Sequence, residues 1–137
     1  MRTKKTELYV HLIWSTWGAE PILADLDEAR LYEVIQEIAA QMSVDALAVG
    51  GTDDHIHVLA RIPSTIPIDH IAVHLKAASA QHIAQSLPPG ARFRWAAAYA
   101  AFTVSQSDVE KLTDYIRSQR VRHASGSVDA AMELSPT

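Results

Sequence analysis

The chain has 137 residues, of which 48% are hydrophobic, and it contains no cysteine. This length suits one domain over residues 1–137, and the lack of thiols excludes disulfides, thiolate metal sites and a cysteine nucleophile. The net charge of −4, taken alone, argues against a nucleic-acid partner, because such partners usually bind basic proteins. There is no run of 18 apolar residues and no signal-peptide pattern, so a cytoplasmic protein is expected.

Strand-like and helix-like segments alternate along the chain. Apolar, β-prone runs predict four strands, over residues 8–16, 44–49 and 55–62 and within 95–105. Apolar residues at helical spacing predict two helices between them, over 28–42 and 68–87. Asp25 or Asp27 would cap the first helix, and a turn over 50–54 would join the second and third strands as a hairpin.

A last helix is predicted after Ser107, which would form a capping box with Glu110. Its apolar side would carry Val109, Leu112, Ile116 and Val121. The residues after Ala124 are expected to form a flexible tail over about 125–137.

The resulting order, strand-helix-strand-strand-helix-strand, is that of the split βαβ or ferredoxin-like fold. We therefore expect an α+β, RRM-like domain with helices on one face of a four-stranded sheet and a C-terminal helix added. The other face would be open to a ligand, a partner or a metal. Because one such fold serves many functions, the functional assignment has to come from the site.

The most informative stretch is His55-Ile56-His57. Alternate side chains of a strand share a face, so His55 and His57 would stand side by side while Ile56 points the other way. Two neutral imidazoles on a rigid strand form half of a metal site, although a polar strand face would give the same triplet. Asp54 could orient one of these histidines, and His11 in the first strand is a weaker candidate for a functional role.

The predicted last helix places Tyr115 and Gln119 four residues apart on one helical face. The Gln119 carbonyl oxygen could join the two imidazoles at a metal ion, and the Tyr115 phenol could attack a phosphate. Lys76 and Arg117 are candidates for phosphate contacts, with ordinary solvated charge as the alternative. Core or dimer contacts, rather than base stacking, are expected for the tryptophans at positions 14, 17 and 95.

This ordered set of residues resembles the single-tyrosine HUH transposases, where U stands for a hydrophobic residue. His55-Ile56-His57 matches the HUH motif, and Tyr115 with Gln119 matches the catalytic tyrosine and the third metal ligand. The resemblance covers most of the chain, through residues 9–16, 54–59, 75–79, 95, 99, 101–105 and 115–119.

The resemblance implies a small insertion-sequence transposase, or a relative tied to repetitive extragenic palindromes (REP), that cuts and rejoins single-stranded DNA with hairpin ends. Tyr115 would keep the 5′ phosphate covalently, and a 3′-OH would be left for the reverse step. His55, His57 and Gln119 would bind Mg²⁺ or Mn²⁺. A homodimer is implied in which the tyrosine of one subunit serves the histidines of the other. The residues alone leave open which subunit's histidines Tyr115 serves.

Two rival functions fit the same residues. A catalytically idle ferredoxin-like dimer would bind DNA or protein without metal, and a metal-dependent phosphodiesterase would use water and form no covalent adduct. The chain also departs from the resemblance at Trp17-Gly18-Ala19-Glu20, where basic residues are frequent, and at Ala77, where glycine is frequent. Because DNA affinity rests heavily on phosphate contacts, these departures bear on the strength of DNA binding rather than on the chemistry.

Overall fold

The computed structural model describes residues 4–126, 129, 132 and 133. Its strands are β1 (Leu8–Ser15), β2 (Asp45–Gly51), β3 (His55–Ile62) and β4 (Ala100–Val104). Its helices are α1 (Glu28–Gln41), α2 (Ile68–Ser86), α3 (Val109–Arg117) and α4 (Gln119–Ser125), with 3-10 turns η1 (Trp17–Ala19), η2 (Ile22–Asp25) and η3 (Gln106–Asp108). None of these helices is long and apolar enough to cross a membrane.

The four strands form one antiparallel sheet in the order β2-β3-β1-β4. β1 and β3 pair along their whole length, from Leu8 opposite Ile62 to Ser15 opposite His55. β2 and β3 form the predicted hairpin, but β2 continues through Gly51, so the turn is shorter than predicted. The predicted α+β fold with its βαββαβ order is confirmed.

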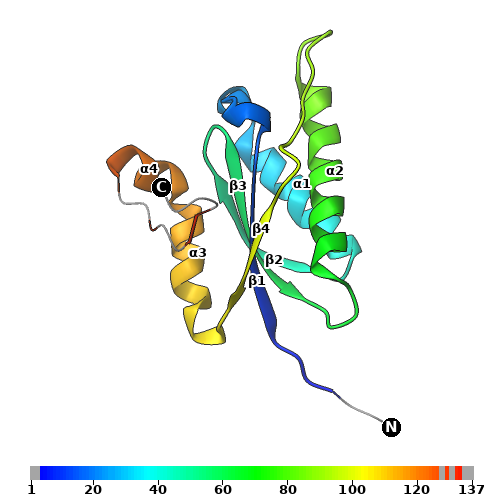
Figure 1. Cartoon of the computed structure of the whole chain (residues 1–137), viewed down its shortest axis with the longest axis vertical. Helices are drawn as coiled ribbons and strands as arrows, with labels where there is room; N and C mark the ends of the chain where they lie inside the picture. The colour runs from blue at the N-terminus through cyan, green and yellow to red at the C-terminus, as the bar shows by residue number, and fades with distance from the viewer. Residues whose placement is uncertain (1–3, 127–128, 130–131, 134–137) are drawn as a thin grey trace.

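Side-chain alternation along the strands divides the core between the two faces of the sheet. α1 and α2 cover one face, where Trp14, Ile56 and Val58 are buried (Figure 1). α3 lies against the other face, where Leu59 and Ile116 are buried (Figure 1). The face predicted to be open is therefore partly covered by the helix that carries the tyrosine.

α1 begins where the sequence predicts. The Asp27 side chain accepts a hydrogen bond from the Arg30 backbone N–H at 3.2 Å, which satisfies one free donor of the first turn. Leu31, Ile35 and Ala39 follow at helical spacing and are buried. These three residues form the apolar side of α1, which packs against the sheet.

The start of α3 differs from the prediction. The capping box of Ser107 and Glu110 does not form, because residues 106–108 make a 3-10 turn in which the Asp108 N–H donates to the Ser105 carbonyl at 2.9 Å. The α-helix therefore begins only at residue 109, with Asp108 at its N-cap and no side-chain hydrogen bond to the cap.

The predicted last helix is also broken, at Ser118. Its hydroxyl donates to the Asp114 carbonyl at 2.7 Å, and its backbone leaves the helical region with φ −105° and ψ 21°. Such local bonds of serine to the preceding turn often bend helices. The break redirects the next turn, so Val121, which was predicted on the apolar side, is 71% exposed.

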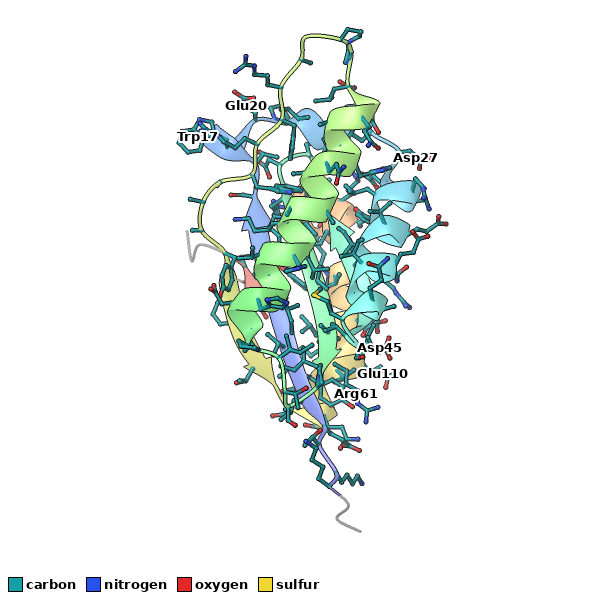
Figure 2. The ribbon with its side chains drawn as sticks, turned by 90° about the vertical axis from the view of Figure 1, so that its right-hand side faces the viewer. Trp17, Glu20, Asp27, Asp45, Arg61 and Glu110 are labelled. Atoms are coloured by element: carbon teal, nitrogen blue, oxygen red, sulfur yellow. The ribbon has the colours of Figure 1, made fainter. Side chains whose placement is uncertain are left out.

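The three tryptophans occupy two kinds of environment. Trp14 and Trp95 are buried and meet edge to face with ring centroids 5.9 Å apart, which confirms their prediction as core residues. Trp17 lies in η1, where Gly18 adopts φ 65° and the chain leaves the sheet (Figure 2). It is 51% exposed, so a core position is wrong for Trp17, and a dimer contact there stays a prediction.

The tail expected over 125–137 falls largely outside the described residues. Ser125 ends α4, and Asp129, Met132 and Glu133 are described further along. Glu133 is buried, at 8% exposure, and contacts residues of α3 and β3. Flexibility of the remaining tail stays a prediction.

Candidate active site

His55 and His57 lie on one face of β3, as their spacing predicts, with ring centroids 5.1 Å apart. The Nε2 atoms of both rings are buried and form no hydrogen bond with any residue that the structure describes. A buried polar atom without a hydrogen bond carries a desolvation cost that a bound ion or ligand would relieve. The pair therefore has the character of an incomplete binding site.

Neighbouring side chains hold the other nitrogen of each ring. His55 Nδ1 lies 2.7 Å from Asp54 Oδ1 and 2.9 Å from Thr52 Oγ1. His57 Nδ1 lies 2.8 Å from Nε2 of His11, which is buried beside it. Such contacts orient imidazoles that bind metals. The orienting contact foreseen for Asp54 is present, and His11, a weak candidate in the sequence, has the same relation to His57.

Tyr115 projects from α3 toward the same pair. Its ring is 2% exposed and lies 6.3 Å, centroid to centroid, from the ring of His57 in the same chain. Its hydroxyl donates to Glu133 Oε2 and accepts the Asp129 backbone N–H at 3.0 Å. Burial, together with the bond to Glu133, raises the pKa of Tyr115 to about 12. The phenol is therefore protonated at neutral pH and needs a proton acceptor before it can attack.

α3 reaches this position because β2 has no side chain at Gly50. Gly50 pairs with His57 across the hairpin, and a Cβ atom at residue 50 would lie 2.0 Å from the carbonyl oxygen of Ile116. The backbone next to Tyr115 thus packs directly on the backbone of the sheet. This close approach sets the height of the tyrosine above the histidines.

Gln119 and His123 extend the site along α4. Gln119 is buried, and its Oε1 lies 3.0 Å from His123 Nε2. His123 is exposed at the surface, with its side chain 32% accessible, and one part of its ring packs on the His55 ring with centroids 4.9 Å apart. Because the helix breaks between them, Tyr115 and Gln119 do not share one helix as predicted, although the Gln119 amide donates to the Tyr115 carbonyl at 3.4 Å.

Glu133 is the site residue that the sequence analysis missed. Its Oε1 lies 3.5 Å from Nε2 of His55, 3.3 Å from that of His57 and 3.5 Å from that of His123. Burial alone would raise the pKa of Glu133, but its close contacts with the His55 and His57 imidazoles and the hydrogen bond from Tyr115 lower it well below its ordinary range. A carboxylate therefore faces the two histidines, and the three ligand atoms lie within 4.8 Å of one another.

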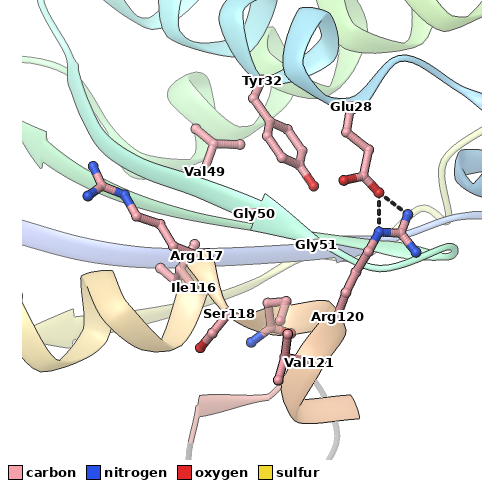
Figure 3. A pocket seen from close by; sticks show the side chains of 11 residues that line it. Glu28, Tyr32, Val49, Gly50, Gly51, Ile116, Arg117, Ser118, Arg120 and Val121 are labelled. Atoms are coloured by element: carbon pink, nitrogen blue, oxygen red, sulfur yellow. Dashed lines mark hydrogen bonds and ion pairs between the residues drawn. The ribbon is translucent and has the colours of Figure 1, made fainter. Parts of the chain in front are cut away.

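Arg120 ties α4 to the rest of the domain. Its guanidinium pairs with Glu28 at the start of α1 and with Asp53 in the hairpin turn, and Figure 3 shows the pair with Glu28. A cavity of about 310 Å³ lies beside this anchor, bordered by Tyr32 and Gly50. The two ion pairs hold α4 at the end of the sheet where β3 begins.

Lys76 and Arg117, the candidates for phosphate contacts, lie outside this cluster. The Lys76 ammonium donates to the carbonyls of residues 96, 97 and 98 at 2.7, 3.2 and 3.4 Å, and partial burial lowers its pKa. Arg117 is exposed on α3, and within the described part of the chain its guanidinium donates to the Leu47 carbonyl, at 3.5 Å. A phosphate contact by either residue stays a prediction.

The fold and the site together define a class of protein: an α+β domain in which a pair of histidines on a strand faces a tyrosine on a following helix. The family model for IS200-like transposases matches residues 4–119. The chain belongs to this family, which confirms the resemblance to single-tyrosine HUH transposases.

Individual relatives agree with this assignment. The chain is 26% identical over 118 residues to the ISDra2 transposase TnpA of Deinococcus radiodurans, covering 82% of this chain and 84% of that protein. It superposes on the crystal structure of a proposed transposase from Deinococcus radiodurans R1 with a TM-score of 0.68 and 26% identity, covering 85% and 93% of the two chains. A REP-associated tyrosine transposase bound to a REP hairpin gives a TM-score of 0.63 at 13% identity, covering 90% and 74%, and shows likeness of fold alone.

Proposed function

We propose that this protein is a metal-dependent transposase that cleaves and rejoins single-stranded DNA through a covalent tyrosine-DNA intermediate. One observation carries the proposal: the Tyr115 hydroxyl and the Nε2 atoms of His55 and His57 all meet at the carboxylate of Glu133. A nucleophile and a cation-binding half-site that converge on one point are what phosphoryl transfer requires.

The donor set around Glu133 fits a divalent cation. Two buried imidazole nitrogens without hydrogen bonds stand next to a carboxylate, a mixed set that suits Mn²⁺ and, less well, Mg²⁺. We propose His55 and His57 as ligands, with Gln119 as the third ligand that the family implies and Glu133 as a further oxygen donor. A cation bound there supplies Lewis-acid stabilisation of the charge on a phosphate oxygen.

Tyr115 supplies the attacking oxygen in this proposal. A bond forms between its hydroxyl oxygen and the phosphorus while the bond from phosphorus to the 3′ oxygen breaks, and the leaving oxygen takes up a proton as a 3′-OH. The Glu133 carboxylate already accepts the phenolic hydrogen bond and is placed to take the proton of Tyr115. The 5′ end stays on the tyrosine, and attack by a 3′-OH reverses the step without a nucleotide cofactor.

Single-stranded DNA with hairpin ends is the partner we propose. The support is membership of a transposase family and a structural relative that is bound to a REP hairpin. The homodimer implied by the resemblance belongs to the proposal as well. Because Tyr115 lies beside His57 of its own chain, one chain can supply both halves of the site.

Incubation of the protein with a single-stranded hairpin oligonucleotide and Mn²⁺ tests the proposal. We expect an adduct that survives denaturing electrophoresis, is absent with EDTA and is lost in Tyr115→Phe. Tyr99→Phe is the matched control, because the Tyr99 hydroxyl bonds Asp69 outside the site, and it should keep the adduct.

Other outcomes identify the rivals. An adduct that persists in Tyr115→Phe would refute the assignment of the nucleophile. Cleavage without any adduct would indicate a phosphodiesterase that uses water. Binding without cleavage or metal dependence would indicate an idle DNA-binding dimer.

A further inference from the structure

An exposed aromatic ring and two arginines lie together just beyond the end of β1. The guanidinium carbon of Arg94 is 3.7 Å from the centroid of the Trp17 ring. Arg92 is also exposed and, with Trp17 and Arg94, lines a cavity of about 450 Å³ that Glu20 borders as well. Figure 2 shows Trp17 and Glu20 at the periphery of the molecule. We call Trp17, Arg92 and Arg94 the tryptophan platform.

Backbone hydrogen bonds hold the platform in place independently of its side chains. The Trp17 N–H donates to the Arg94 carbonyl at 3.0 Å, and Thr16 forms an isolated β-bridge with Trp95. Two segments that are far apart in the sequence are thus fixed side by side. The platform is a rigid feature of the fold, as a binding surface should be.

The same region is joined to the active site. Ser15 pairs with His55 in the sheet, so Trp17 follows the partner of a proposed metal ligand by two residues, a reach of about 7 Å along the chain. The Thr16 N–H donates to the Asp54 carbonyl at 2.8 Å, and the carboxylate of Asp54 contacts the His55 ring. The platform therefore lies at the histidine end of the sheet.

The chemistry of the platform selects the kind of partner. The chain as a whole carries a net charge of −4, but the platform presents two guanidinium groups against the single carboxylate of Glu20. Single-stranded nucleic acids bind to aromatic rings through their base faces and to cationic groups through their phosphates. A duplex stacks its base faces on one another, so it cannot use the ring of Trp17 in this way.

We propose that the tryptophan platform binds an unpaired nucleotide next to the scissile phosphate, with its base on the Trp17 ring and its phosphate at Arg92 or Arg94. The proposal rests on the proposed function for its substrate. The aromatic ring of the platform comes from the turn after β1, and its two cations come from the segment before β4.

Trp17 can report on binding directly, because Trp14 and Trp95 are buried. The probe is a short oligothymidine added to the full-length protein in EDTA, so that no cleavage interferes. We expect quenching of tryptophan fluorescence by the single strand and none by a blunt duplex of equal length. Equal quenching by the duplex would overturn the proposal.

Variants separate stacking from charge. Trp17→Ala should weaken binding of the single strand about 10-fold or more, whereas Trp17→Phe, which keeps a ring, should retain most of the affinity. The variant of whichever arginine contacts the phosphate, Arg92→Ala or Arg94→Ala, should lower the slope of log affinity against log salt by about 0.7. Arg61→Ala removes an exposed arginine near the far end of β3 and should change neither quantity. Unchanged binding by Trp17→Ala would overturn the proposal.

Adduct formation with Mn²⁺ distinguishes failure of this proposal from failure of the proposed function. If the wild-type protein forms the Tyr115 adduct and Trp17→Ala binds DNA normally, the platform is refuted and strand transfer stands. If binding depends on Trp17 but no adduct forms, the platform stands and strand transfer is refuted.

Discussion

Replacing Gly50 by alanine should push the tyrosine helix off the sheet. The new Cβ would lie 2.0 Å from the Ile116 carbonyl oxygen and 2.9 Å from its carbon, where real Cβ atoms stay at least about 3.0 Å away. Neither atom can rotate aside, because both belong to the backbone. α3 or β2 must therefore move by about 1 Å, and we expect the free energy of unfolding to fall by about 3 kcal/mol.

The same movement should slow the chemistry more than it affects the metal half of the site. Tyr115 precedes Ile116, so it shifts with the helix, and a misplacement of about 1 Å can cost about 100-fold in rate. Urea unfolding measures the loss of stability, and the rate of adduct formation at saturating Mn²⁺ measures the loss of activity. Manganese affinity should fall less than the rate, because His55 and His57 are on β3 and Gln119 is held through Arg120, while Glu133 alone bonds the shifted Tyr115 hydroxyl.

Gly90→Ala is the matched control for this change. A Cβ at residue 90 meets no atom within 4 Å, although φ is 88°. Gly90→Ala should lower the free energy of unfolding by only about 1–2 kcal/mol, because alanine disfavours the left-handed backbone, and it should leave the adduct rate unchanged. A Gly50→Ala protein with the stability and activity of the wild type would refute the idea that this backbone contact positions Tyr115.

Four further substitutions test individual contacts. His11→Ala removes the partner of His57 Nδ1 and should weaken Mn²⁺ binding about 10- to 100-fold in a calorimetric titration, and an unchanged affinity would contradict the orienting role. Glu133→Gln keeps the size of the side chain but loses its charge, so Mn²⁺ affinity should fall; if it does not, the carboxylate is not a ligand. Arg120→Ala breaks two ion pairs of half-exposed side chains and should lower the free energy of unfolding, measured with urea, by less than about 1 kcal/mol. A larger loss would show that these ion pairs contribute more than surface pairs usually do. Lys76→Met removes the donor of three carbonyls, two of them open to water, and should cost about 0.5–1.5 kcal/mol, whereas a Lys76 used only for DNA would leave stability unaltered.

Sequence patterns predicted the elements well where side-chain periodicity and burial agree. The strand over 55–62 and the helix from Glu28 match the structure because apolar residues repeat with the period of each element. The predicted start of the last helix was wrong. Serine is a common N-cap residue, but the backbone at Ser107 forms a 3-10 turn instead. The break at Ser118 depends on a single side-chain bond, and helical periodicity continues across it without a signal.

The site was predictable only where its residues have fixed spacing in the sequence. His55 and His57 are two residues apart on a strand, so the period of the strand alone places them together. Glu133 follows Tyr115 by 18 residues, beyond a helix break and a Ser-Gly segment, and no local pattern connects the two. His11 meets His57 only through the pairing of β1 with β3, a contact between residues 46 positions apart.

Because of the break at Ser118, α3 and α4 are attached to different parts of the domain. Tyr115 is fixed through α3 to β2, whereas Gln119 and His123 are fixed through Arg120 to α1 and the hairpin turn. A torsional change at this one joint would alter the spacing between phenol and amide while each helix keeps its own anchor. In the proposed strand transfer, such a joint would let the distance between the phenol and the Gln119 amide differ between steps without detaching either helix.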